Sequence, residues 1–316
     1  MIPFVIRRVV NLVPVLFVLT VVVFGFVELL PGDTIDYIMG DGSVDNPEVR
    51  NAVTKELGLD RPIYVRYGKW LLRVMRGELG KSLVTRRDVT LELFDRIPAT
   101  VYLALSGMVL SMLIAIPLGT LAAVKRNTWV DKAIQVFLLL GISIPEFWFA
   151  IMAILLFALQ LGWLPFSGYT SPLENLPESI TFLILPAVAI GLRQAAYTTR
   201  LTRSSMLDEM NKEYVDTARS LGFSESRVMY KYTLRNAMIP TLTISGLQFA
   251  DLLGGTVVLE MIFAWPGIGR VIYEAILQRD YPMIQSGVLV LGFFVVIINL
   301  LVDIAYRMLN PRVELS

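Results

Sequence analysis

EYVDTARSLG at residues 213–222, continued by FSESRVMYKYTLRNAMIP to residue 240, is a polar and basic stretch between two long apolar segments. Its pattern predicts helix. A membrane protein that keeps a structured polar helix between two spans presents that helix to the adjacent water, where a partner can bind. The alternative is an amphipathic helix that lies on the membrane surface, with its basic residues near anionic lipid.

Tyr214, Ala218 and Leu221 recur at helical spacing within this stretch. Because Ala218 is small, we expect the backbone of a partner to approach closely there. Gly222 can adopt a positive φ, so we expect it to end the helix. Ser224 is then the predicted N-cap of the next helix.

The composition is that of a polytopic membrane protein. The chain has 316 residues, of which 55% are hydrophobic and 17% charged, whereas soluble domains carry about 25% charged residues. The net charge of +1 gives no reason to expect nucleic acid as a partner. The sequence has no cysteine and no histidine, which excludes disulfides, Cys or His metal sites and histidine acid–base chemistry. We therefore expect no catalytic residue, metal or cofactor in this chain.

Six apolar segments are long enough to cross a bilayer, whose core takes about 20 residues of helix. The first runs from Val9 to Val27 without a charge, which is longer than the apolar part of a cleaved signal peptide. The sequence thus predicts an all-α polytopic membrane protein with six transmembrane helices. The expected spans are Val9–Leu30, Pro98–Val124, Ala133–Leu161, Ser179–Tyr197, Ile239–Leu259 and Tyr281–Val302.

Positive charges give the direction of these spans, because Lys and Arg concentrate in short cytoplasmic loops. Arg7 and Arg8 precede the first span, and the segment 200–235 carries seven basic residues. The loop around 165–177 carries none. Both termini are therefore predicted to be cytoplasmic, and the long segment 31–97 is predicted to lie outside.

The outer segment contains two helical patterns, Pro47–Leu57 and Ile63–Arg76, and we expect a small folded element there. In the second pattern, Tyr64, Tyr67, Leu71 and Val74 share a face. Gly80-Lys81-Ser82 is similar to the end of a phosphate-binding loop. The required glycine five residues earlier is Met75, so we do not expect nucleotide to bind there.

Three charges lie within the predicted spans, where an ionised group is costly unless it is paired. Asp251 either lines a substrate pathway and meets a cationic amine, or pairs with a group on a partner subunit. Glu146 follows Pro145 and either caps a broken half-helix or contacts substrate. Arg193 is expected to extend towards the inner interface.

The stretch that opens at Glu213 resembles a motif of permease subunits in binding-protein-dependent ABC importers, of the dipeptide, oligopeptide and nickel branch. These subunits share an inner loop of the form Glu-Ala-Ala-x-x-x-Gly, which docks on an ATPase subunit. Here the loop has Asp216 for Glu and Thr217 for the first Ala. The peptide branch commonly reads Thr-Ala-Arg-x-x-Gly and then Leu-Arg-Asn-Ala-x-Ile-Pro, and this chain has both, at residues 217–222 and 234–240.

The resemblance covers nearly the whole chain. Five further segments are similar to signatures of the same family: Leu30-Pro31-Gly32-Asp33, Leu57 to Pro62, Gly77 to Ser82, Phe263 to Arg270, and Arg279 to Pro282. The resemblance implies a type I ABC importer-like transmembrane domain with a cytoplasmic coupling helix. It divides the chain into residues 1–30 (cytoplasmic tip and first transmembrane helix), 31–97 (extracytoplasmic segment), 98–308 (transmembrane core with a coupling loop at 198–238) and 309–316 (cytoplasmic tail).

The resemblance also implies the rest of the machine. The partners would be a second permease subunit of a different chain, two ATPase subunits that hold ATP and Mg, and an extracytoplasmic substrate-binding protein. The location would be the prokaryotic cytoplasmic (inner) membrane, and the cargo a dipeptide or oligopeptide. The residues expected to dock on the ATPase are Glu213, Tyr214, Asp216, Thr217, Ala218, Arg219, Leu221 and Gly222, and Asp251 and Glu146 are expected to line the pathway.

Two alternatives stay open at this point. In the first, the same kind of importer transports a nickel chelate, haem or an oligosaccharide in place of a peptide. A secondary transporter belongs to a different class, and it would need charge relays and usually repeated halves. No repeat is visible in the sequence.

Overall fold

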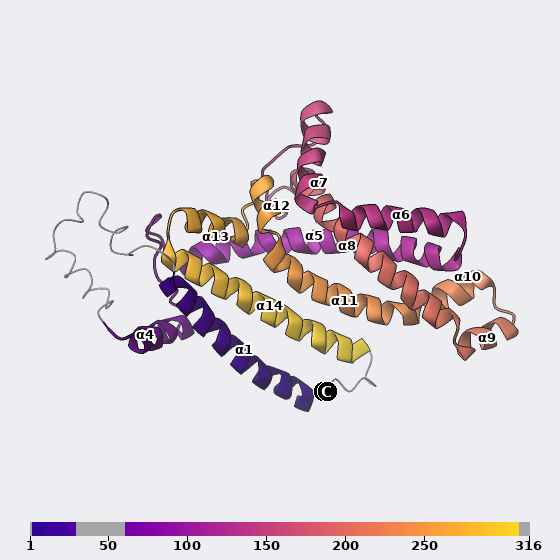
Figure 1. Cartoon of the computed structure of the whole chain (residues 1–316), viewed down its shortest axis with the longest axis horizontal. Coiled ribbons are helices and arrows are strands. Elements are labelled where there is room, and N and C mark those ends of the chain that lie inside the picture. Colours follow the sequence, from indigo (N-terminus) through magenta and orange to yellow (C-terminus); the bar gives the residue numbers. More distant parts are fainter. Residues whose placement is uncertain (1, 30–60, 310–316) are drawn as a thin grey trace. The chain divides into compact units, whose positions relative to one another are not determined.

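The computed structural model describes the backbone of residues 2–29 and 61–309, and this part of the chain is helical apart from its turns and one isolated β-bridge between Lys81 and Asp88 (Figure 1). The predicted all-α class is confirmed for these residues. Their elements are α1 (Ile2–Leu29), α4 (Ile63–Met75), α5 (Val89–Val124), α6 (Trp129–Ser143), α7 (Glu146–Ala153), the π-helical segment η1 (Ile154–Gln160), α8 (Leu176–Met210), α9 (Glu213–Ser220), α10 (Glu225–Arg227), the π-helical segment η2 (Val228–Thr233), α11 (Leu234–Gly255), α12 (Val257–Ile262), α13 (Ile268–Leu277) and α14 (Tyr281–Leu309).

The chain forms two compact units. The first comprises Met1–Pro98 and Pro266–Val296, and the second comprises Ala99–Trp265 and Ile297–Ser316. The expected helix at Pro47–Leu57 lies outside the described residues.

Four helices of the described part are long and apolar enough to cross a membrane, namely α1, α5, α8 and α14. A fifth span results if α6 and the α7–η1 segment count together, although they meet at an angle of 96°. The predicted fifth span, Ile239–Leu259, is interrupted: α11 ends at Gly255 and α12 begins at Val257. Six spans therefore stay a prediction.

The sharp bend at Pro145 follows from local chemistry. Proline disfavours a helical conformation in the residue before it, and Ile144 is extended at φ −82° and ψ 123°. Proline itself then occupies the cap position before α7. The single predicted helix Ala133–Leu161 is therefore two helices, and the interruption lies where the sequence places Glu146.

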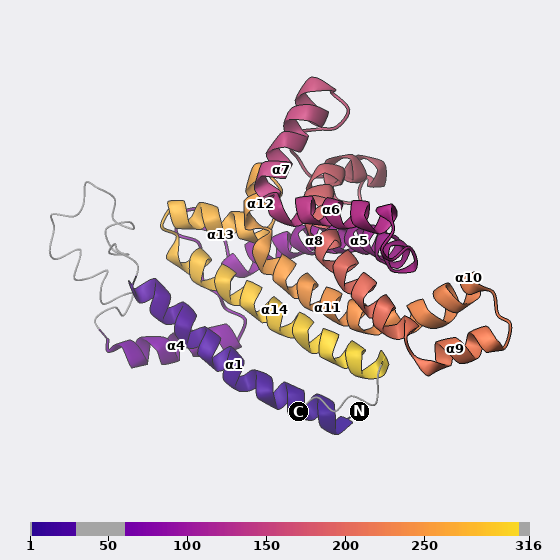
Figure 2. The ribbon, with the colours of Figure 1, turned by 45° about the vertical axis from the view of Figure 1, so that its right-hand side comes forward.

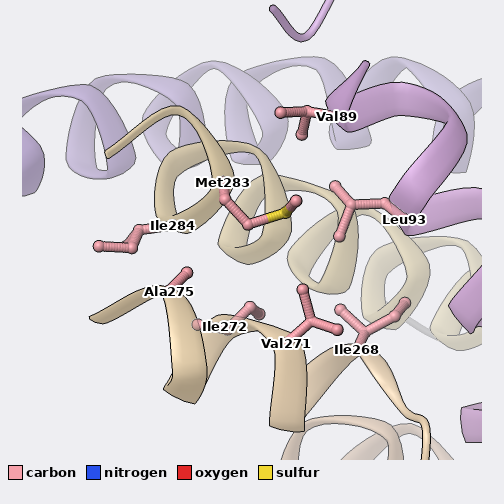
Figure 3. Packing of buried hydrophobic residues seen from close by; sticks show 8 residues of the cluster. All are labelled: Val89, Leu93, Ile268, Val271, Ile272, Ala275, Met283 and Ile284. Carbon is pink, nitrogen blue, oxygen red and sulfur yellow. The ribbon is translucent and has the colours of Figure 1, made fainter. Parts of the chain in front are cut away.

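The core of the first unit joins the beginnings of α5, α13 and α14 (Figure 3). Apolar side chains from the three helices converge there, and this fixes the residues on either side of the loop that precedes α14. The buried members are Val89, Leu93, Ile268, Val271, Ile272, Ala275, Met283 and Ile284.

The predicted helix at Ile63–Arg76 is present as α4, and it packs on α1 within the first unit. Arg66 forms a bidentate ion pair with Glu28 at 2.9 and 2.6 Å, and the Tyr67 hydroxyl lies 2.8 Å from Thr20 Oγ1. Three of the four residues that share a face in the sequence, Tyr67, Leu71 and Val74, pack in the cluster with α1. Tyr64 is 72% exposed, whereas Trp70, one turn from Tyr67, is buried against α1.

Two separate sequence signatures meet at Asp280. The buried Ser82 hydroxyl donates a short hydrogen bond to Asp280 Oδ2, and the Leu83 N–H donates to Oδ1 at 3.2 Å. Asp280 Oδ1 also accepts from the Met283 N–H at 3.4 Å, so the carboxylate caps the beginning of α14. Ser82, in the segment that is similar to a phosphate-binding loop, is thus a structural residue.

In the second unit, α8 packs along α11 and α6, and α8 and α11 lie side by side in Figures 1 and 2. Small residues permit close approach. A Cβ at Gly119 would lie 2.7 Å from Thr202 Cβ, and one at Gly246 would lie 2.7 Å from Val302 Cγ1. Between α8 and α11, Thr198 donates to Gln248 Oε1 at 3.0 Å. Small residues and hydroxyl bonds are the usual means of packing helices in lipid.

We predict that Ser82→Ala and Asp280→Ala each destabilise the protein by on the order of 1–3 kcal/mol, because each leaves buried polar groups without a partner. Thermal unfolding of the purified transporter in detergent, followed by tryptophan fluorescence, measures the change in midpoint. The double variant should lose less than the sum of the single variants, because the two residues share one interaction.

Asp95→Asn is the matched control, because Asp95 is an exposed carboxylate of α5 in the same unit. It should leave the midpoint unchanged. Strict additivity of the two single effects would contradict the proposed coupling between Ser82 and Asp280.

Candidate functional site

The polar stretch that follows α8 folds as a helical loop. α9 begins at Glu213 and ends at Ser220, and Gly222 follows with φ +79°. The chain then enters α10 and η2, and it continues without a break into α11. The predicted end of the helix at Gly222 is confirmed. Ser224 is at the predicted N-cap position of α10, although its side chain makes no capping hydrogen bond.

This loop has its own small core. Val215 and Ala218 from α9 are buried against Val228 and Met229 of η2. Ala218 is only 6% exposed and packs on its own chain, so its small side chain belongs to the core of the loop, and its contact with a partner stays a prediction. The reason is that an eight-residue helix is not stable in water alone, and its apolar row is needed to hold it on the loop.

The opposite face of α9 is exposed and charged. Arg219 pairs with Asp216 at 3.2 Å and with Glu225 at 2.9 Å, which ties α9 to α10. The hydrogen bond with Glu225, and secondarily the pair with Asp216, raise the pKa of Arg219, so it remains a cation. Leu221 is 69% exposed, which leaves a large apolar side chain at the end of this polar face.

Tyr214 anchors the beginning of α9. Its hydroxyl donates to Glu209 Oε2 at 2.7 Å, and Lys212 donates to Glu209 Oε1 at 2.6 Å. Burial disfavours the phenolate and raises the pKa of Tyr214, so the hydroxyl keeps its proton and remains a donor. The contact joins α9 directly to the end of α8.

The eight predicted docking residues therefore form two groups. Two of the eight are covered, since Tyr214 is half-buried and Ala218 is buried. The six exposed residues are Glu213, Asp216, Thr217, Arg219, Leu221 and Gly222. Figures 1 and 2 show α9 and α10 at one end of the α8–α11 pair.

The second group of candidates lies around the bend at Pro145. Glu146 is in the first turn of α7, but Pro145 is the N-cap and no side chain makes a capping hydrogen bond, so the capping interpretation is not confirmed. Arg193 Nη1 donates to Glu146 Oε2 at 3.0 Å, which joins α8 to the bend. The expectation that Arg193 extends to the inner interface is therefore wrong: a carboxylate within reach offers a guanidinium stronger stabilisation than a longer path to water.

Asp251 lines the same open pocket as this ion pair, between α7, α8 and α11. The pocket has a volume of about 320 Å³. Its polar lining consists of Glu146, Arg193, Gln194, Tyr197, Gln248, Asp251 and Thr256. The structure thus brings the two predicted pathway residues together at one site.

Sequence reasoning missed four of these residues, namely Gln194, Tyr197, Gln248 and Thr256. A helical face was the available signal. Gln194 and Tyr197 are three residues apart on α8, and Gln248 is three residues before Asp251 on α11. A search for polar residues on the same helical face as Arg193 and Asp251 would have found Gln194, Tyr197 and Gln248.

Solved structures with a similar fold include two crystal forms of an inward-facing MetNI methionine ABC transporter, with TM-scores of 0.55 and 0.57 and 15% and 17% identity. A crystal structure of an amino acid ABC transporter with histidines gives 0.53 at 13% identity. Each covers 69% of this chain and at least 94% of the solved chain. At this identity the match shows the fold, which is that of the transmembrane subunits of type I ABC importers.

Relatives match over nearly the full length. A Brucella abortus protein with a provisional name as a peptide transport system permease protein is 42% identical and covers 98% of both chains. The dipeptide transport system permease protein DppB of Alkalihalophilus pseudofirmus is 38% identical, over 99% of this chain and 100% of its own. The glutathione transport system permease protein GsiC of Escherichia coli is 39% identical, over 99% of each chain.

Two family descriptions cover the chain. Residues 1–104 match the N-terminal part of the membrane component of binding-protein-dependent transport systems. Residues 115–315 match the inner membrane component of the same systems. The chain is therefore a multi-pass inner membrane permease that belongs to the family of binding-protein-dependent transport system inner membrane components.

Proposed function

We propose that this chain forms half of the translocation pathway of an ATP-driven importer for dipeptides and oligopeptides. The observation that carries the proposal is the folded polar loop of α9 and α10, which is tied to the ends of α8 and α11. The names of the full-length relatives support peptide as the cargo. A nickel chelate, haem or an oligosaccharide is not favoured by any residue of the pocket.

The proposed machine contains a second permease, two ATPase subunits that bind ATP and Mg, and an extracytoplasmic binding protein. α9 is the proposed coupling helix. Its exposed face, with Glu213, Asp216, Thr217 and Leu221, would fill a groove on an ATPase subunit. This chain would carry no catalytic group, and hydrolysis would take place on the partner subunits.

The proposed mechanism is rigid-body motion. ATP closes the ATPase dimer because it binds the closed form more tightly, and the two coupling helices then approach each other. α9 transmits this motion to α8 through the hydrogen bond between Tyr214 and Glu209, and to η2 and α11 through its buried core. Packed helices respond by tilting, which opens the pathway alternately to the two sides.

The proposed topology has six spans and both termini in the cytoplasm. α11 supplies the fifth span despite its polar content, because Asp251 and Gln248 line a pocket. The proposed domains are residues 1–30, 31–97 and 98–308, with a coupling loop at 198–238 and a tail at 309–316. Asp251 and Glu146 would line the pathway between the two permeases.

The topology can be tested with single cysteines, because the natural chain has none. Leu173 is 96% exposed and precedes α8, and Ser220 is exposed in α9. A membrane-impermeant maleimide should label Ser220→Cys in inside-out vesicles only and Leu173→Cys in right-side-out vesicles only. The unmodified chain is the blank. Labelling of Ser220→Cys from the outside would refute the proposed docking on a cytoplasmic ATPase.

Gly222 gives a test of the coupling and of the function. A Cβ at Gly222 would meet no atom of this chain within 4 Å, so within the loop a substitution acts through the positive φ. A β-branched residue is strained there, whereas asparagine tolerates this conformation. In proteoliposomes that hold the full transporter, binding protein and ATP, we expect labelled trialanine to accumulate. Gly222→Val should reduce the uptake rate about tenfold, which corresponds to about 1.4 kcal/mol.

Gly222→Asn is the matched control and should transport at nearly the natural rate. Both variants should insert and assemble normally. Equal transport by the valine and asparagine variants would contradict the role of the turn, and absence of ATP-dependent uptake by the natural transporter would contradict the proposed function.

The pair of Glu146 and Arg193 gives a third prediction. Glu146→Gln or Arg193→Gln leaves one charge without its partner at a depth where charges are costly. We expect each variant to lower the free energy of unfolding of the assembled transporter by on the order of 1–3 kcal/mol, and its thermal midpoint accordingly. The loss is limited because the Arg193 side chain is 48% exposed. The double variant should recover most of the loss. Arg200→Gln, at an exposed position of α8, is the control, and a double variant as unstable as the sum would show that the pair is unimportant.

A further inference from the structure

The pocket around Asp251 contains a carboxylate that no described residue satisfies. Among the residues that the structure describes, no hydrogen bond or ion pair reaches the Asp251 side chain, and Asp251 is exposed in the pocket. Glu146 in the same pocket is neutralised by Arg193 at 3.0 Å. The pocket therefore holds two carboxylates and one guanidinium, and it has an excess of one negative charge, located at Asp251.

The same pocket also offers donors. Arg193 bonds to Glu146 and to Tyr197, and its side chain is 48% exposed, so some of its five N–H groups remain available to a ligand. Gln248 accepts from Thr198 through Oε1 at 3.0 Å, which fixes the amide and leaves its NH₂ group as a donor. The Tyr197 hydroxyl lies on the same lining. Donors on α8 and α11 thus flank the Asp251 acceptor.

This combination matches the one end that ordinary peptides share. Every unmodified peptide begins with an α-ammonium group, which has three N–H donors, followed within a few ångströms by a carbonyl oxygen, which is an acceptor. The volume of about 320 Å³ is at the lower end of the range for small-molecule sites. It suits one terminal residue and its peptide bond better than a folded or long cargo.

We propose that this pocket binds the free amino terminus of the transported peptide, with Asp251 holding the α-ammonium group and Arg193 and Gln248 holding the first carbonyl. The proposal rests on the proposed function and adds a recognition site within the permease itself. Because the contacts involve only main-chain groups of the peptide, the site recognises the amino terminus and does not select among side chains. The pair with Glu146 positions Arg193 for this contact.

The test is equilibrium binding of trialanine to the assembled transporter in nanodiscs, with the binding protein omitted. Radiolabelled trialanine should bind, and N-acetyl-trialanine, which lacks the ammonium charge, should bind at least tenfold more weakly. Asp251→Asn should weaken trialanine to the level of the acetylated peptide and so abolish the discrimination. Trialanine amide, blocked at the other end, should bind like trialanine.

Asp208→Asn is the matched control, because Asp208 is an exposed carboxylate on α8 outside the pocket. It should keep the tenfold discrimination. Discrimination that persists in Asp251→Asn, or no binding of trialanine to the natural transporter at millimolar concentration, would overturn the proposal. So would loss of the second permease from Asp251→Asn on purification, because it would assign Asp251 to the contact between permeases.

The proposed function has a test that is independent of the amino-terminus site. It requires ATP-dependent uptake of trialanine in the presence of the binding protein. Normal uptake together with unchanged discrimination would reject the amino-terminus site and leave the importer in place.

Discussion

The contact of Val215 and Ala218 with Val228 and Met229 is the interaction on which the proposed coupling through the second unit depends. A helix of eight residues does not persist alone in water, because nucleation costs more than so few hydrogen bonds return. The small core holds α9 to η2, and the Tyr214 hydroxyl holds it to α8. Only a helix fixed at both ends can transmit a force from a partner to two spans.

The requirement for rigidity also explains the distribution of charge on the loop. Arg219 bridges Asp216 and Glu225 on the exposed side, where surface pairs contribute little to stability. Their effect is geometric, because they fix α10 against α9. The apolar Leu221 remains uncovered beside them, which is the arrangement expected of a contact surface with a charged rim and an apolar anchor.

The sequence alone was sufficient for the helical class, for the end of α9 at Gly222 and for the family, because these follow from local chemistry and from motifs. The sequence was insufficient to decide which face of an amphipathic helix packs against the protein itself and which face is exposed. Ala218 was expected to face a partner, yet the apolar row of so short a helix is required for its own core. Tyr64 shares a helical face with Tyr67 yet is exposed, and Trp70 is buried, because the position of α1 decides which side chains of α4 are covered.

Long-range pairs were beyond the sequence as well. Ser82 and Asp280 belong to two signatures almost two hundred residues apart, and no local rule connects them. Arg193 was assigned to the membrane interface because its distance from Glu146 along the chain hides their contact across the bend at Pro145. The bend at Pro145 interrupts the helix, and it also brings Glu146 within reach of Arg193, which neutralises its charge.

The α9–α10 loop, which is the proposed coupling loop, and the pocket are connected by the same two helices, α8 and α11. Glu209, which binds Tyr214, is 16 residues after Arg193 on α8, or about 24 Å along the helix at 1.5 Å per residue. Asp251 is 17 residues after Leu234 at the start of α11, so the pocket is about equally far from the loop along either helix. A tilt of about 5° at the loop would therefore move the pocket residues by about 2 Å. That displacement is comparable with the 3.0 Å that separates Arg193 from Glu146, and hence the proposed ATP-driven motion would change which groups Arg193 can reach.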